Sequence, residues 1–251
     1  MGIITLITDF GSFYPAVMKA AILNIAPNAT IIDVTHNISP HGVREGAFIL
    51  RETVKYFPRG TVHIAVVDPT VGTERQGLVV DAGGQYLIGP DNGLLIPAAR
   101  YLGNFEVLRI QMVAKSPTFH GRDVFAPVGA HIFRGQLPHL ERSPTFVDLR
   151  LEEAQQREDA LLGTIVFVDR FGNCVTNIPS SLMIARSDYG SSHLLNESTR
   201  LRFVRTYDEA AEGQPLLTIG SFDLMEIAMN KGDAAKELNL SVGDKIALVT
   251  L

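Results

Sequence analysis

The strongest constraint on the fold is an alternation of strand-like and helix-like segments in the first third of the chain. Apolar, strand-like runs occupy residues 3–8, 29–35 and 61–67, and apolar side chains at helical spacing occupy residues 15–25 and 42–56. Runs that are apolar throughout are typical of strands that are buried on both faces of a sheet. This β-α-β-α-β order predicts an α/β domain whose mostly parallel sheet carries helices on both faces.

The pattern changes after residues 138–160, which form a more polar and charged connecting segment. Six short strand-like runs follow between residues 163 and 251, with turn residues between them. This rhythm is typical of a small antiparallel sheet or barrel. We therefore predict two domains: an α/β domain at residues 1–155 and a smaller all-β, barrel-like domain at residues 156–251.

Composition narrows the classes of function. Of the 251 residues, 46% are apolar and 20% are charged, which is typical of a soluble globular protein. A net charge of −5 without a basic block argues against a nucleic-acid partner. No apolar run approaches the roughly 20 residues that span a bilayer, and the N-terminus lacks the basic region of a signal peptide. With Cys174 as the single cysteine, we expect a cytoplasmic protein without an intrachain disulfide or a cysteine-based metal site.

Polar residues follow each of the three long apolar runs. Asp9, His36 and Asp68 stand at these positions, and each is followed by residues typical of turns. In an open parallel sheet, ligands bind beyond the carboxyl ends of the strands. Aspartate is also a common turn initiator and helix cap, so each residue alone has a structural explanation. The three together favour a functional site.

His120 differs from the other histidines because it directly precedes a predicted helix, which begins near Gly121 or Arg122. Free N–H groups at a helix start suit an anion or a polarised water, although a capping role fits His120 equally well. The chain contains no GxGxxG, no GxxxxGK[ST] and no HExxH. A Rossmann dinucleotide site, a Walker site and a histidine-based metal site are therefore not predicted.

Two further clusters lie in the second half. Asp169, Phe171 and Asn173 fall within five residues, and we expect this stretch to be a β-hairpin turn that also contributes to a pocket for a heterocycle. Residues 219–230, with Ser221 and Glu226, are expected to be a loop that enters an amphipathic segment. The structural alternative for this second cluster is core packing by Leu224, Ile227 and Ala228, with Ser221 as a cap.

Eight motifs occur in the same order as in the S-adenosyl-L-methionine (SAM) hydrolases, also called SAM hydroxide adenosyltransferases. They are TDFG at 8–11, DVTH at 33–36, VVDPTVGTER at 66–75, PDNG at 90–93, TFHGRDVFAP at 118–127, VDRFGNCVTNI at 168–178, GSFDLMEIAMN at 220–230 and VGD at 242–244. The chain resembles this family over nearly its full length. The same family is related to the bacterial fluorinase and chlorinase.

The resemblance implies an α/β domain with a C-terminal β-barrel, in a homotrimer that binds SAM between subunits. It also implies hydrolysis of SAM to adenosine and L-methionine without a cofactor, with Asp68, Arg75 and His120 as the catalytic trio. The halogenating relatives carry a tyrosine in place of Asp68 and Tyr-Ser in place of His120-Gly121, so the chain resembles the water-using branch. Two alternatives stay open, a halide adenosyltransferase of the same fold and a non-catalytic SAM- or adenosine-binding protein. Whether Asp68 or His120 accepts the proton from water also stays open.

The resemblance further implies roles in binding. Asp9 is expected to bind the ribose hydroxyls, and Asp169 and Ser221 the amino and carboxylate groups of methionine. Further substrate contacts are expected from Phe171, Asn173, Tyr207 and Glu226, with Tyr207 stacking on the base. The chain departs from the family at residues 13–20, FYPAVMKA in place of PYVGxMKG, and at Thr70, where the family usually reads DPGVGT. A threonine at this position is costly if the backbone has φ > 0.

Overall fold

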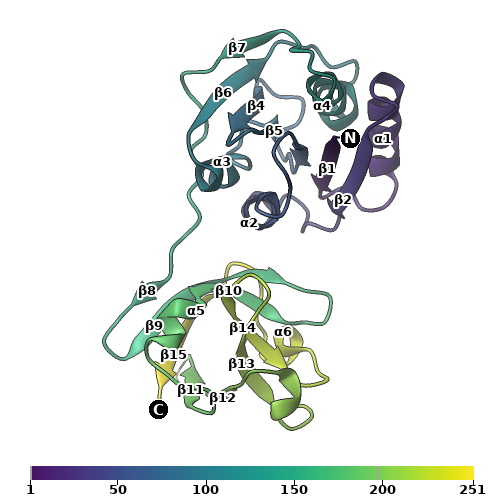
Figure 1. The fold of residues 1–251 in the computed structure, drawn as a ribbon. Coiled ribbons are helices and arrows are strands. Elements are labelled where there is room, and N and C mark those ends of the chain that lie inside the picture. The colour runs from purple at the N-terminus through teal and green to yellow at the C-terminus, as the bar shows by residue number, and fades with distance from the viewer. Residues whose placement is uncertain (1, 197) are drawn as a thin grey trace. The chain divides into compact units, whose positions relative to one another are not determined.

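The computed structural model describes residues 2–196 and 198–251 and divides into two compact units (Figure 1). The first unit ends at Leu151 and the second begins at Glu152, slightly before the expected boundary at residue 155. None of the helices in these described ranges has the length and apolar character needed to span a membrane.

The first unit is built on one seven-stranded sheet. Its strand order is β2 (Thr30–Thr35), β1 (Ile3–Thr8), β3 (Val62–Val66), β5 (Gln85–Pro90), β4 (Gly77–Ala82), β6 (Phe105–Ile110) and β7 (Leu140–Arg142). The strands β2, β1, β3 and β5 are parallel, and β4, β6 and β7 continue the sheet in antiparallel pairs. The α/β class is confirmed, with a mixed sheet. The antiparallel β4–β5 pair is joined by the two-residue Gly83-Gly84 turn, whose φ values of 58° and 81° suit a tight hairpin.

Helices cover both faces of this sheet, as the alternating pattern predicts. They are α1 (Tyr14–Ile25), α2 (Val43–Val54), α3 (Ile96–Leu102), the π-helical turn η1 (Gly121–Phe125) and α4 (Ala126–Phe133). One buried cluster joins Leu6 and Ile64 to α1 and α4, and a second joins Ile7 and Ala65 to α2 and α3 (Figure 1). Neighbouring residues of each strand thus face opposite clusters, because successive side chains of a strand alternate.

The second unit is a closed barrel, so the expected all-β, barrel-like class is confirmed. Its strands are β10 (Cys174–Pro179), β14 (Leu224–Met229), β13 (Pro215–Ile219), β12 (Thr199–Phe203), β11 (Ser192–Leu195), β15 (Lys245–Thr250) and β9 (Ala160–Val168). Pairing of β10 with β9 closes it, and β8 (Gln155–Gln156) pairs with β9. Three short helical segments lie between strands: α5 (Ser180–Ile184), η2 (Tyr207–Glu209) and α6 (Ala234–Glu237). Residues 224–229, expected to form an amphipathic segment, are the buried strand β14.

A buried polar network ties the centre of the first sheet together. His63 on β3 lies between Thr5 on β1 and Gln85 on β5, with Nδ1 2.7 Å from Thr5 Oγ1 and Nε2 2.6 Å from Gln85 Oε1. Because the Gln85 amide nitrogen donates to the carbonyl oxygens of Val54 and Phe57, Oε1 is the acceptor for His63. His63 therefore carries its proton on Nε2 and is neutral. Burial lowers the pKa of His63 to about 4.

This network predicts an acid-sensitive fold. The unfolded chain protonates His63 near pH 6.5, whereas the folded protein protonates it only near pH 4, so stability falls as the pH falls through this window. This difference in pKa lowers the free energy of unfolding by about 3 kcal/mol between pH 7 and pH 4. Urea unfolding of the wild type and of His63→Gln at pH 7 and pH 4 measures this loss of stability. We expect His63→Gln to lose less stability at pH 4 than the wild type does, and an equal loss in both proteins would contradict this role of His63.

Candidate active site

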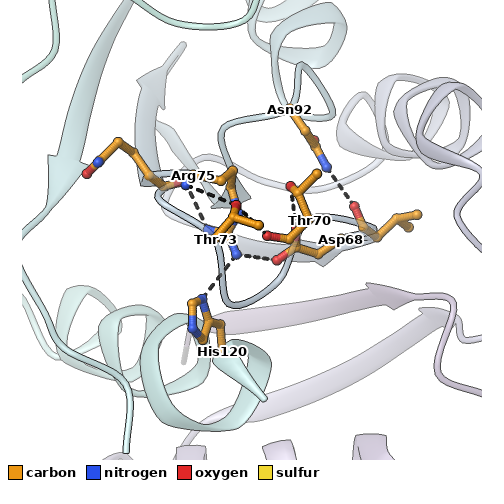
Figure 2. Close-up of polar contacts among 8 residues, drawn as sticks. Asp68, Thr70, Thr73, Arg75, Asn92 and His120 are labelled. Atoms are coloured by element: carbon orange, nitrogen blue, oxygen red, sulfur yellow. Dashed lines mark hydrogen bonds and ion pairs between the residues drawn. The ribbon is translucent and has the colours of Figure 1, made fainter. Parts of the chain in front are cut away.

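The loop after β3 folds back on itself between Asp68 and Arg75 (Figure 2). The amide and hydroxyl of Thr73 donate to the carbonyl oxygen of Thr70, at 3.2 and 2.8 Å. Gly72 has φ = 82°, and a Cβ there would lie 2.7 Å from the carbonyl oxygen of Pro117, so the loop requires glycine at this position. Thr70 does not adopt a positive φ. The sterically demanding position is residue 72, and threonine at residue 70 is compatible with the loop.

Arg75 joins the other two members of the expected trio. Its Nη2 forms an ion pair with Asp68 Oδ2 and also hydrogen-bonds His120 Nδ1 at 3.1 Å (Figure 2). The side chains of Arg75 and Asp68 are 7% and 4% exposed, so this ion pair is almost entirely removed from water. The Arg75 guanidinium also lies 5.5 Å from the centre of the Phe125 ring. Arg75 thus folds back onto Asp68, and His120 completes the cluster.

The contact with Arg75 fixes the protonation of His120. A guanidinium group only donates hydrogen bonds, so His120 Nδ1 accepts, and the neutral ring carries its proton on Nε2. Burial lowers the pKa of His120, and the positive charge of Arg75 lowers it further, whereas Asp68 and Asp123 act in the opposite direction. His120 directly precedes η1 but makes no side-chain capping bond there. The capping interpretation is therefore wrong.

Asn92, from the PDNG motif, supports the strand end that carries Asp68. Its side-chain amide donates to the carbonyl oxygen of Val67 at 2.8 Å (Figure 2). The sequence motif was visible, but this contact was not, because it links residues that are distant in the chain. Asn92 thus helps to fix the backbone from which the Asp68 side chain projects.

The other two strand-end residues act on a neighbouring loop. His36 Nδ1 lies 2.9 Å from Thr8 Oγ1, and its carbonyl oxygen accepts from Gly11 N at 2.9 Å, so His36 holds the chain on both sides of Asp9. Asp9 Oδ2 accepts a hydrogen bond from His41 N at 3.0 Å. Among the residues that the structure describes, no hydrogen bond links Asp9 or His36 to Asp68. Of the three strand-end candidates, Asp68 alone joins Arg75 and His120.

In the second unit, Asp169 organises the turn between β9 and β10. Its Oδ1 accepts from the amides of Phe171 and Asn173 at 2.8 and 2.9 Å, and its Oδ2 accepts from Asn173 Nδ2 at 2.9 Å. This is the expected hairpin turn, and it also borders a pocket. The pocket has a volume of about 410 Å³ and is lined by Phe171, Asn173, Tyr207, Met229, Asn230, Lys231 and Gly232. The hairpin and pocket interpretations of this stretch are thus compatible.

Tyr207 and Glu226 form a hydrogen-bonded pair beside this pocket. The Tyr207 hydroxyl donates to Glu226 Oε1 at 2.6 Å. Burial raises the pKa of Glu226, and the nearby Asp169 raises it further.

Ser221, in contrast, is exposed in the β13–β14 turn and is not among the residues that line the pocket. Sequence reasoning had not singled out Lys231 and Gly232, whose only local signal is the turn at the end of β14.

Comparisons with known proteins agree with these features. Residues 4–141 match the family described as SAM hydroxide adenosyltransferase N-terminal domain, and residues 163–247 match the corresponding C-terminal domain. The (R)-S-adenosyl-L-methionine hydrolase of Methanocaldococcus jannaschii is 36% identical, with 99% of this chain and 96% of that protein covered. A fluorinase of Actinoplanes sp. is 28% identical, with coverages of 96% and 95%. The crystal structure of an uncharacterized conserved protein from Thermotoga maritima superposes with a TM-score of 0.90 at 33% identity, covering 98% of this chain and 99% of that one.

The arrangement around His120 predicts its titration. Nitrogen-detected NMR of the imidazole is expected to show a neutral ring protonated at Nε2 and a pKa below that of an ordinary histidine. In Arg75→Met the pKa of His120 is expected to rise, because a nearby positive charge is lost and Asp68 is left unpaired. His139, an exposed histidine, serves as the internal reference in the same spectra. A pKa of His120 that stays constant on removal of Arg75 would contradict the electrostatic link.

Proposed function

This chain belongs to the SAM hydroxide adenosyltransferase family, and we propose that it hydrolyses SAM to adenosine and L-methionine. The observation that carries the proposal is the buried contact of Arg75 with both Asp68 and His120, in a chain that matches both domains of the family. The family expected from the eight sequence motifs is confirmed by these matches.

The reaction is a substitution at the ribose C5′ carbon of SAM. A water oxygen forms a bond to C5′, the C5′–S bond breaks, and methionine leaves as a neutral thioether with the electron pair. One proton of the water must be released. Because the positive charge of the sulfonium disappears during attack, a site that excludes bulk water favours the transition state. The low exposure of Asp68 and Arg75 provides such surroundings.

Asp68 is the proton acceptor in this proposal. The Nδ1 atom of His120 is occupied by Arg75, and its Nε2 atom already carries a proton, so the neutral ring has no free basic nitrogen. Asp68 Oδ2 is held by Arg75, which leaves Oδ1 to face the water. His120 Nε2–H then donates to the water oxygen and orients it for in-line attack.

In this proposal, residues of both units also bind SAM, as the resemblance suggests. Asp9 uses Oδ2 for the loop, which leaves Oδ1 for a ribose hydroxyl. Asp169 uses three of its roughly four acceptor positions within its turn, which leaves one for the methionine ammonium group. The pocket beside Phe171, Asn173 and Tyr207 has walls that suit adenine. Glu226 orients the Tyr207 ring through its hydroxyl, and Ser221 binds the methionine carboxylate.

We further propose that the protein acts as a homotrimer without a cofactor. In this arrangement, the N-terminal domain of one subunit and the C-terminal domain of its neighbour share each SAM molecule. The resemblance to the family supports this proposal. A halide-using activity is disfavoured, because the Asp68 carboxylate would repel an anionic nucleophile, and because the cited fluorinase is less similar than the hydrolase.

Incubation with SAM in ¹⁸O-labelled water tests the reaction directly. We expect adenosine labelled at its 5′ oxygen, together with equimolar unlabelled methionine, by mass spectrometry. Asp68→Asn is expected to lower kcat at least about 100-fold, because it loses the proton acceptor. His120→Ala should lower kcat about 10- to 100-fold with little change in SAM affinity, and His139→Ala is the matched control at an exposed histidine.

Other outcomes separate the alternatives. Tight binding of SAM without adenosine formation would support a binding protein instead of an enzyme. Formation of a 5′-halogenated nucleoside when chloride is added would support the halide-using alternative. Full turnover by Asp68→Asn would overturn the assignment of Asp68.

Co-expression of two impaired variants tests the shared site. Asp68→Asn disables the N-terminal contribution, and Asn173→Ala weakens the C-terminal one. With equal expression and random assembly, about a quarter of all sites combine two intact halves, so turnover recovers to about that fraction of wild type. Each variant expressed alone is the control. If every site lies within one chain, mixing gives no recovery.

A further inference from the structure

Thr70 places a hydroxyl beside Oδ1, the oxygen of the Asp68 carboxylate that Arg75 does not contact. Thr70 Oγ1 donates to Asp68 Oδ1 at 3.3 Å, whereas Asp68 Oδ2 is occupied by Arg75 (Figure 2). The carboxylate is thus held at both oxygens, by a charged group on one and a hydroxyl on the other. A glycine at position 70 would leave Oδ1 without this donor.

The loop holds Thr70 in place for this contact. Its carbonyl oxygen accepts two hydrogen bonds from Thr73, and its backbone is free of the positive φ that Gly72 adopts. The Thr70 side chain therefore projects from an anchored backbone without φ strain. A β-branched side chain also has few χ1 rotamers, which limits the alternatives to this contact.

The donors and acceptors of this cluster match those of one water molecule. A hydroxyl that donates to Asp68 keeps its lone pairs free to accept a hydrogen bond. A water seated here directs one hydrogen to Asp68 Oδ1 and the other to Thr70 Oγ1. A lone pair of the water oxygen is then left for the bond to C5′.

We propose that Thr70 is a water-positioning residue, an inference that rests on the hydrolytic function proposed above. Its hydroxyl fixes the orientation of the Asp68 carboxylate and accepts the hydrogen of the water that is not transferred. During attack, the transferred proton moves to Asp68 Oδ1, the O–C5′ bond forms, and the C5′–S bond breaks with its electron pair leaving on sulfur. The second O–H bond stays intact and becomes the 5′-hydroxyl of adenosine.

Two substitutions separate this role from a structural one. Thr70→Val keeps the branched shape and loses the hydroxyl, and Thr70→Ser keeps the hydroxyl and loses the methyl group. We expect Thr70→Val to lower kcat about tenfold, as for one hydrogen bond to a charged group, with KM and the melting temperature unchanged. Thr70→Ser is expected to stay within about twofold of wild-type kcat.

The kcat of each variant is compared with that of the wild type. If the wild type forms no adenosine, the proposed function fails, and this inference fails with it. If the wild type is active and Thr70→Val has the same kcat, only the role of Thr70 is overturned. Equal losses of kcat in Thr70→Val and Thr70→Ser would show that packing matters instead of the hydroxyl, and would also overturn it.

Discussion

The buried Arg75 guanidinium is the interaction on which the candidate site depends. One nitrogen atom, Nη2, contacts both Asp68 and His120, so a single group sets the position of a carboxylate and the protonation of an imidazole. Two charges removed from water are costly unless they are well paired, and removal of either partner leaves an uncompensated charge. We therefore interpret the Arg75–Asp68 ion pair as part of the candidate site and not as a main source of stability. Its geometry leaves one carboxylate oxygen, Oδ1, available for chemistry.

The fold supplies what this ion pair requires. Parallel strands bring Asp68 to the end of β3, Asn92 fixes the carbonyl just before it, and Gly72 lets the loop pass close to Pro117. The loop returns Arg75 to Asp68 within seven positions, whereas His120 comes from a segment 45 positions further on. A tight local turn and a long-range packing contact are thus both necessary. The Phe125 ring beside the guanidinium adds an apolar wall that keeps bulk water away.

Sequence patterns predicted the parts that depend on local periodicity. The apolar runs indicated β1, β2 and β3, and helical spacing indicated α1 and α2, because burial on a sheet leaves these periods in the sequence. The hairpin of β4 and β5 and the strand β14 were harder to predict. Short apolar runs do not reveal strand direction, and they do not separate strands from helices. Periodicity also could not identify the partner of His120. The capping interpretation failed because a long-range contact with Arg75 outweighed a local preference at the start of η1.

Two carboxyl groups of the protein, those of Asp68 and Glu226, have partners of different charge. Asp68 is paired with the permanently charged guanidinium of Arg75. Glu226 is buried with a neutral partner, the Tyr207 hydroxyl, and its pKa is raised by burial and by the nearby Asp169. The hydrogen bond from the hydroxyl to Glu226 holds the Tyr207 ring in place. A cationic partner in one unit and a phenol in the other thus give the two carboxyl groups different surroundings, which fit the proton-accepting role proposed for Asp68 and the orienting role proposed for Glu226.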